Sequence, residues 1–145
     1  MARGGDPTSA PHSARPRLTT VCVDCGDAEA LAAFYGRLLG WEIVARDEPS
    51  DRQGGAGWVL LKDPASGVGL SFQAEAWYQP PAWPEEPGAL TKMMHLDFEV
   101  EDVDAAVAYA VAAGARVAPH QPPGRDPSTL RVMLDPAGHP FCLFT

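Results

Sequence analysis

The sequence predicts an α+β fold built from two tandem β-α-β-β-β modules. Two observations lead to this prediction. A strand, an acidic helix start and an alanine-rich helix occur twice, with Asp27 of the first copy matching Asp102 of the second, an offset of 75 residues. An Asp-Pro-Ala turn followed by an apolar stretch also occurs twice, at residues 63–65 and 135–137. Two copies of one unit in a chain predict a pseudo-symmetric fold with a cleft between or beneath the units.

The length of 145 residues suits one compact domain with a buried core. We expect a disordered tail (1–17) followed by a single domain (18–145). Within the domain, the first module covers 18–74, the linker 75–92 and the second module 93–145. The tail is rich in Pro, Gly, Ser and Ala and has no apolar run, which favours a mobile segment over a signal peptide or an anchor.

Charge and cysteine content limit the partners and the compartment. A net charge of −8 disfavours nucleic acid, because phosphate binding needs clustered Lys and Arg. No apolar run approaches the roughly 18 residues that span a bilayer, so we expect no membrane partner and a cytoplasmic protein. The three cysteines, Cys22, Cys25 and Cys142, form an odd set that argues against a disulfide framework. Cys22 and Cys25 fall within one expected strand and point to opposite faces, so they are poorly placed to share a metal.

The first module begins with alternating residues 18–25, which predict a half-buried strand. Asp27 is expected to cap the following helix, and Gly40 to end it. The apolar stripe of this helix follows helical spacing and consists of Leu31, Phe34, Tyr35 and Leu38. Further strands are expected at 41–46, 58–62 and 69–73.

The second module begins with residues 94–100, which alternate between apolar and polar side chains. This pattern predicts a strand with one helix-covered face and one polar face. Asp102 is expected to cap a helix that ends at Gly114 and buries Val103, Ala106, Val107, Ala110 and Val111. The proline-rich residues 119–128 predict a loop, and strands are expected at 116–118, 130–134 and 140–144.

Three strings add to the repeat: Leu-Gly-Trp-Glu at 39–42, His-Leu-Asp at 95–97 and Asp-Pro-Ala-Gly-His-Pro-Phe at 135–141. Together they resemble the glyoxalase, bleomycin-resistance and extradiol-dioxygenase (vicinal oxygen chelate) superfamily, and especially its small glyoxalase-like branch. The resemblance implies a curved, mixed eight-stranded sheet around a cavity, with the helices outside, and a homodimer whose partner closes the cavity. It also implies that one polar face lines the cavity, namely Thr20, Cys22, Asp24, His95, Asp97 and Glu99.

The same resemblance implies where a metal would bind. Metal-dependent members carry His or Gln on the first strand of each module and Glu on the last. These places hold His95 and Thr20 on the first strands, and Cys142 and Ser71 (or Gln73) on the last strands. Mg²⁺ and Mn²⁺ favour carboxylate oxygens, iron typically needs two histidines and a carboxylate, and zinc needs three or four strong ligands. We therefore expect no cofactor, and a divalent metal, if bound, would use His95 and Cys142.

Two further groups have alternative interpretations. His95 beside Asp97 is the best candidate for acid–base catalysis, but both could be hydrogen-bonding groups in a wet cavity. The linker residues Trp77, Tyr78 and Trp83 could form an aromatic lid over a planar ligand, or could cover apolar surface without any ligand.

The leading hypothesis is a metal-independent small-molecule binding protein, acting in ligand sequestration or resistance. The chief alternative is an enzyme, either a metal-dependent lyase or dioxygenase centred on His95, or a metal-free isomerase or hydrolase using His95 and Asp97. A third is an interaction module whose cavity is filled by its own side chains. The expected ligand-binding residues are Thr20, Cys22, Asp24, Ser71, Gln73, Trp77, Tyr78, Trp83, His95, Asp97, Glu99 and Cys142.

Overall fold

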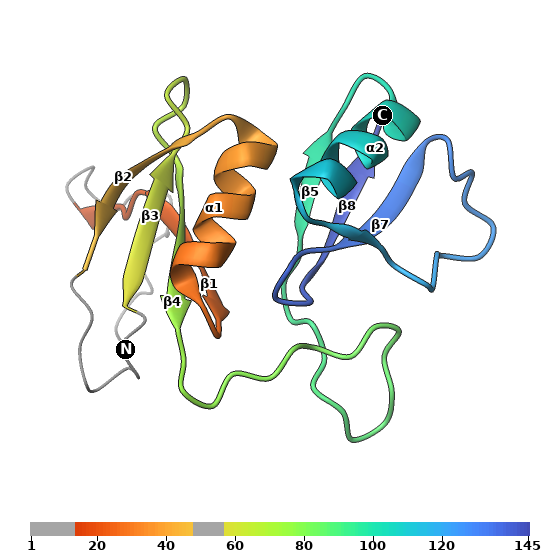
Figure 1. The fold of residues 1–145 in the computed structure, drawn as a ribbon, viewed down its shortest axis with the longest axis horizontal. Coiled ribbons are helices and arrows are strands. Elements are labelled where there is room, and N and C mark those ends of the chain that lie inside the picture. The colour runs from red at the N-terminus through yellow and green to blue at the C-terminus, as the bar shows by residue number, and fades with distance from the viewer. Residues whose placement is uncertain (1–13, 48–56) are drawn as a thin grey trace, which may run out of the picture.

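The computed structural model describes residues 14–47 and 57–145 and contains both β-α-β-β-β modules in the predicted order (Figure 1). The first module consists of β1 (Thr20–Cys25), α1 (Ala28–Leu39), β2 (Glu42–Arg46), β3 (Trp58–Lys62) and β4 (Gly69–Ala74). The second consists of β5 (Leu96–Glu99), α2 (Val103–Ala113), β6 (Arg116–Val117), β7 (Leu130–Leu134) and β8 (Pro140–Phe144). The predicted α+β class is confirmed. Most of the expected tail, residues 1–13, lies outside the described residues.

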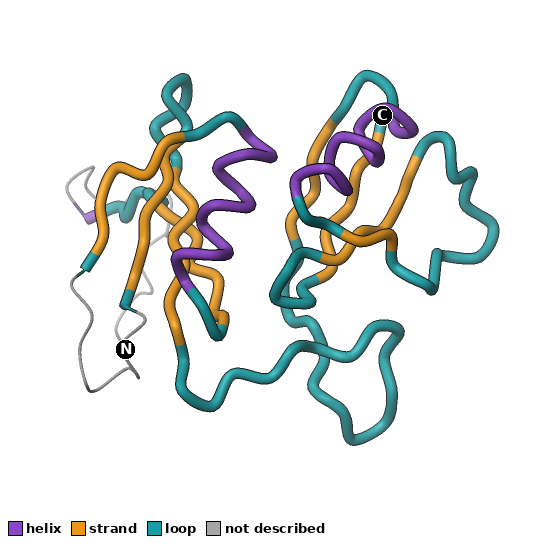
Figure 2. Tube along the Cα trace, in the orientation of Figure 1, coloured by secondary structure: helices purple, strands orange, loops and turns teal. Residues whose placement is uncertain are grey.

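The strands form two four-stranded mixed sheets of identical topology, β1-β4-β3-β2 and β5-β8-β7-β6. In each sheet the first strand pairs in parallel with the last, and the other pairings are antiparallel. Figure 2 shows each sheet with its helix, and the long linker that crosses from one module to the other. In the described part of the chain, β1 and β5 each have one unpaired edge.

The first strand of each module has the two faces that the alternation predicts. In β1, Cys25 is buried in the core while Cys22 and Asp24 are exposed. In β5, Phe98 packs against the core and its neighbours Asp97 and Glu99 are exposed. The polar faces predicted for both strands are therefore present.

Both helices begin with the predicted aspartate cap. The side chains of Asp27 and Asp102 accept hydrogen bonds from the backbone N–H groups of Ala30 and Ala105, each at 3.0 Å. Helix α1 ends at Gly40, whose φ of 68° is left-handed and favours glycine. No helix among the described residues combines the length and apolar character that crossing a bilayer requires.

Helix α1 joins the two modules into one core. The Tyr35 ring stacks on Phe72 of β4 with ring centroids 5.3 Å apart, and the Phe34 ring lies 6.2 Å from that of Phe141 in β8. The buried cluster that contains these residues includes side chains of both modules. As Figure 1 shows, α1 lies between the first sheet and the second module.

One residue of α2 that was predicted to lie in the core is exposed. It buries Val103, Ala110 and Ala113, but Val111, which the predicted stripe included, is 47% exposed. Val111 is displaced by about 100° around the helix from Ala110, so when Ala110 faces the core Val111 turns toward solvent. The prediction that Val111 is buried was wrong.

Candidate functional site

A cleft of about 390 Å³ lies where the two modules and the linker meet. Residues 21–24 of β1 form one side, and residues 90–96, from the end of the linker into β5, form another. Tyr35 of α1, Tyr78 of the linker and His139 of the β7–β8 turn also line it. The cleft therefore runs along β1 and reaches the start of β5, at the junction that the repeat predicts.

Some of the predicted ligand-binding residues line this cleft, namely Cys22, Asp24, Tyr78 and His95. Others lie elsewhere. Ser71, Gln73 and Cys142 belong to β4 and β8, one strand further from the edges that bound the cleft. The cleft lining also omits Thr20, Trp77, Trp83, Asp97 and Glu99.

The linker aromatics separate into three environments. Trp77 is 94% exposed, and Tyr78 lines the cleft. Trp83 donates its indole N–H to the carbonyl of His120 at 3.1 Å and packs against the small apolar cluster of the second module. The Nζ of Lys92 lies 4.7 Å from the centre of the Trp83 ring. Trp83 therefore covers protein surface, and Tyr78 is the aromatic residue of the three that can touch a ligand in the cleft.

Sequence reasoning missed Tyr35 and His139 as cleft residues. Tyr35 was predicted only as part of the apolar stripe of the first helix, and His139 only as part of the string at 135–141. The structure places the half-buried His139 in the cleft wall. A comparison of the two Asp-Pro-Ala turns could have identified His139, because the turn of the first module has no histidine.

A hydrogen-bonded junction forms one wall of the cleft. The Nε2 of His139 lies 2.6 Å from the carbonyl oxygen of Asp24 and 3.2 Å from the hydroxyl of Tyr78. Because a carbonyl oxygen only accepts, Nε2 carries the proton. Tyr78 in turn donates to the carbonyl of Ala137 at 2.6 Å. Burial and nearby Asp135 raise the pKa of Tyr78, which keeps this hydroxyl protonated. The junction ties β1, the linker and the β7–β8 turn together.

Beneath this junction, Asp135 is completely buried. Its Oδ1 accepts the backbone N–H groups of Ala137 at 2.9 Å and His139 at 3.0 Å, and its Oδ2 accepts the Tyr35 hydroxyl at 2.8 Å. Burial raises the pKa of Asp135, and the hydrogen bond from Tyr35 partly offsets that rise. The carboxyl group therefore fixes the turn that carries His139 and links it to α1.

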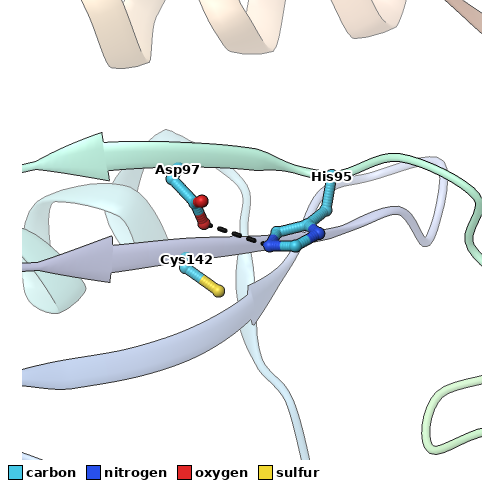
Figure 3. A group of neighbouring side chains, drawn as sticks. All are labelled: His95, Asp97 and Cys142. Carbon is cyan, nitrogen blue, oxygen red and sulfur yellow. Dashed lines mark ion pairs between the residues drawn. The ribbon is translucent and has the colours of Figure 1, made fainter.

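Of the candidate catalytic pair, His95 lines the cleft and Asp97 does not; Figure 3 shows both residues with Cys142. His95 Nε2 is 3.1 Å from Asp97 Oδ1, and Cys142 is the residue opposite Asp97 on the neighbouring strand β8. One potential ligand atom from each of these residues lies within 4.8 Å of the others. Burial and the adjacent Asp97 raise the pKa of Cys142 to about 11, so its thiol is protonated at neutral pH.

These residues fit a metal poorly. Mg²⁺ and Mn²⁺ favour oxygen ligands, and this group offers one carboxylate. Zinc accepts all three ligand types, but the Cys142 thiol would first have to lose a proton held with a pKa of about 11. Asp97 already interacts with both His95 and Cys142. The donor set therefore does not match the metal centres implied by the family resemblance.

Two β-α-β-β-β modules that meet at a cleft are the defining arrangement of the vicinal oxygen chelate superfamily. The model of the glyoxalase-like domain family matches residues 20–144, and the chain belongs to this family. No curated protein matches the sequence.

Solved structures share the fold. A glyoxalase family protein from Enterococcus faecalis superposes with a TM-score of 0.64 at 21% identity, covering 89% of this chain and 97% of its own. Glyoxalase I of Leishmania major, described as trypanothione-dependent, gives 0.59 at 16% identity, with coverages of 90% and 87%. The antibiotic binding protein TnmS3 from Streptomyces sp. CB03234 gives 0.56 at 22% identity, with coverages of 92% and 98%. The same fold therefore occurs in an enzyme and in a binding protein.

Proposed function

We propose that this chain binds an organic small molecule in the cleft between its modules, without a metal, and acts in sequestration or resistance. The cleft is the observation that carries this proposal. Its volume of about 390 Å³ lies in the usual range for ligand pockets, roughly 300–1,000 Å³. Apolar side chains such as Leu90 and Pro140 line it, with the polar groups of Asp24, Tyr78 and His95 among them. The likeness to an antibiotic binding protein supports this choice.

The cleft mouth favours an apolar or aromatic ligand. Met93 and Met94 line the cleft, yet they are 93% and 75% exposed. Methionine side chains are flexible and polarizable, so they adapt to ligands of different shapes. A ligand that covered them would gain from removing their apolar surface from water.

A pair of neighbouring linker variants tests the proposal. Purified protein is screened by ligand-observed NMR against drug-sized aromatic antibiotics and metabolites. For compounds that bind, Tyr78→Ala should weaken affinity about tenfold or more, because it removes an aromatic wall of the cleft. Trp77→Ala is the control, since Trp77 is 94% exposed and does not line the cleft. Equal losses in both variants, or no binding in the screen, would contradict the proposal.

The proposal that the protein binds no metal has a separate test. After dialysis against zinc and then against metal-free buffer, elemental analysis should find far less than one zinc per chain. Stoichiometric zinc that disappears in His95→Ala would show that the imidazole is a ligand and would overturn this part of the proposal.

The alternative function is enzymatic, and the His95–Asp97 contact of 3.1 Å is the observation that favours it. A carboxylate at this distance can orient an imidazole for proton transfer in an isomerase or hydrolase. Turnover of a bound compound, reduced in Asp97→Asn and unaffected by a chelator, would support this metal-free form. Turnover that a chelator abolishes would support the metal-dependent lyase or dioxygenase.

We further propose that the protein is a cytoplasmic homodimer. The exposed Met93 and Met94 offer apolar surface that a partner could cover while closing the cleft. The three cysteines are free, which suits a reducing compartment. Light scattering that gives a monomer mass at micromolar concentration would contradict the dimer, and recovery of the native protein in an exported fraction would contradict the location.

A further inference from the structure

The positive and potentially positive side chains of the cleft already have partners within the protein. The Nζ of Lys92 lies 4.7 Å from the centre of the Trp83 ring. The Nε2 of His95 lies 3.1 Å from Oδ1 of Asp97. The Nε2 of His139 lies 2.6 Å from a backbone carbonyl oxygen of β1. The cleft lining contains no arginine, so an anionic ligand would have to compete with these contacts.

The carboxylate of Asp24 has no such partner. Asp24 lies on β1, lines the cleft and is exposed. Its backbone carbonyl contacts His139, but within the described part of the chain no hydrogen bond or ion pair occupies its carboxylate. The cleft therefore presents one unpaired negative charge on the β1 side.

The wall next to Asp24 is also electrostatically negative. Burial raises the pKa of the Tyr78 hydroxyl, and the nearby charges of Asp135, Cys25 and Asp24 raise it further. The two carboxyl groups oppose a negative charge on the Tyr78 oxygen, and by the same interaction they favour a positive charge close to it. The face of a tyrosine ring attracts cations as well. The part of the cleft around Asp24 and Tyr78 is therefore suited to a positively charged group.

We propose that the ligand of the cleft is an organic cation, namely a compound that carries an ammonium group on an apolar or aromatic body. This inference rests on the proposed function, because it names the class of molecule that the same cleft binds. The ammonium group lies beside the carboxylate of Asp24, and the body lies against apolar lining residues such as Leu90, Met94 and Pro140. The net charge of −8 favours the approach of such a molecule.

A divalent metal ion suits this position less well than an ammonium group. Mg²⁺ and Ca²⁺ need about six oxygen ligands or more. Asp24 contributes one carboxylate, and the neighbouring lining residues Val21, Cys22 and Val23 have no oxygen in their side chains. An ammonium group needs only hydrogen-bond acceptors for its three donors, and water can accept those that the carboxylate does not reach.

The test uses three probe compounds that share a naphthalene body and differ in charge. They are naphthylethylamine, naphthylethanol and naphthylacetic acid, all substituted at the same ring carbon. Isothermal titration calorimetry at neutral pH measures the dissociation constant of each. The amine should bind about tenfold more tightly than the alcohol, because it gains an ion pair and a cation–π contact. The acid should bind more weakly than the alcohol, and added salt should reduce these differences.

Two variants locate the charge that discriminates among the probes. Asp24→Asn removes the negative charge and keeps the backbone carbonyl that His139 contacts. This variant should bind the amine about fivefold more weakly and the alcohol as the parent does. Glu42→Gln is the matched control, because it removes one negative charge from an exposed position of β2 outside the cleft. It should leave the affinity for every probe unchanged.

The outcomes separate this inference from the proposed function. Equal binding of the amine and the alcohol, or a preference for the amine that persists in full in Asp24→Asn, would overturn the inference and leave small-molecule binding in the cleft intact. Tyr78→Ala should weaken the binding of all three probes, since Tyr78 lines the cleft. Binding that Tyr78→Ala does not change, or no binding of any probe at millimolar concentration, would count against both the inference and the proposed function.

Discussion

Replacing Tyr35 by phenylalanine removes one hydroxyl from the centre of the molecule and leaves its ring in place. The ring keeps its stacking on Phe72 and its edge contact with Phe34, at centroid distances of 5.3 Å and 4.8 Å. The substitution removes a hydrogen bond from Asp135, which is fully buried and whose Oδ2 accepts the Tyr35 hydroxyl at 2.8 Å. We therefore expect Tyr35→Phe to isolate the contribution of one buried hydrogen bond.

The expected cost is about 2 kcal/mol at pH 8, because a hydrogen bond to a charged group contributes about 1.5–3 kcal/mol. For a chain of this size the melting temperature should fall by about 4–8 °C. Urea denaturation followed by tryptophan fluorescence measures the free energy of unfolding. The effect should also depend on pH, since burial raises the pKa of Asp135 above its ordinary value of 3.8 and the Tyr35 hydroxyl opposes that rise.

A carboxyl group whose pKa is higher in the folded state lowers stability as the pH rises from its unfolded value through its folded value. Removing the Tyr35 hydroxyl raises the folded pKa of Asp135 further, so the variant loses more stability at pH 8 than at pH 4.5. Tyr109→Phe is the matched control, because that exposed hydroxyl donates to the carbonyl of Arg37 at 2.6 Å and no carboxylate is involved. An equal loss at both pH values, or one no larger than that of the control, would refute this reasoning.

Other predictions concern the cysteines and the helix caps. At pH 8 a thiol reagent should modify exposed Cys22 quickly and Cys142 slowly, because the pKa of Cys142 is raised to about 11. Asp97→Asn should speed the reaction of Cys142, because Asp97 helps to raise the pKa of this thiol. Each decrease of one in that pKa raises the thiolate fraction about tenfold. Mass spectrometry of the labelled peptides distinguishes the two cysteines. Asp27→Ala and Asp102→Ala should each lower the free energy of unfolding by about 1 kcal/mol in urea denaturation, because each removes an equivalent cap bond of 3.0 Å. A clear effect in one variant alone would show that the two caps are not equivalent.

Local signals predicted most of the fold. The caps at Asp27 and Asp102 and the end of α1 at Gly40 depend on neighbouring residues, so the sequence contains the information directly. The internal repeat predicted that the two modules have the same order of strands and helix. Val111 shows the limit, since which side of α2 faces the core depends on packing against distant strands.

The candidate site was harder to predict because its walls come from segments far apart in the sequence. The cleft includes residues 90–93, around the end of the linker, which have no helical or strand periodicity. His139 reaches Asp24 across 115 positions of the chain. Strand alternation did place Cys22 and His95 on the polar faces of their expected strands, and both line the cleft.

The two Asp-Pro-Ala turns satisfy their aspartates differently. In the first, Ser66 donates to Asp63 Oδ2 at 2.7 Å, so the turn is complete in itself. In the second, the place of Ser66 is taken by Gly138, where a Cβ atom would come within 2.8 Å of Pro80. The donor for Asp135 comes instead from Tyr35 in the other module. The two modules therefore cannot replace each other: in a chain assembled from two second modules each would bury an aspartate, and the place of Tyr35 would be taken by alanine, as at Ala110.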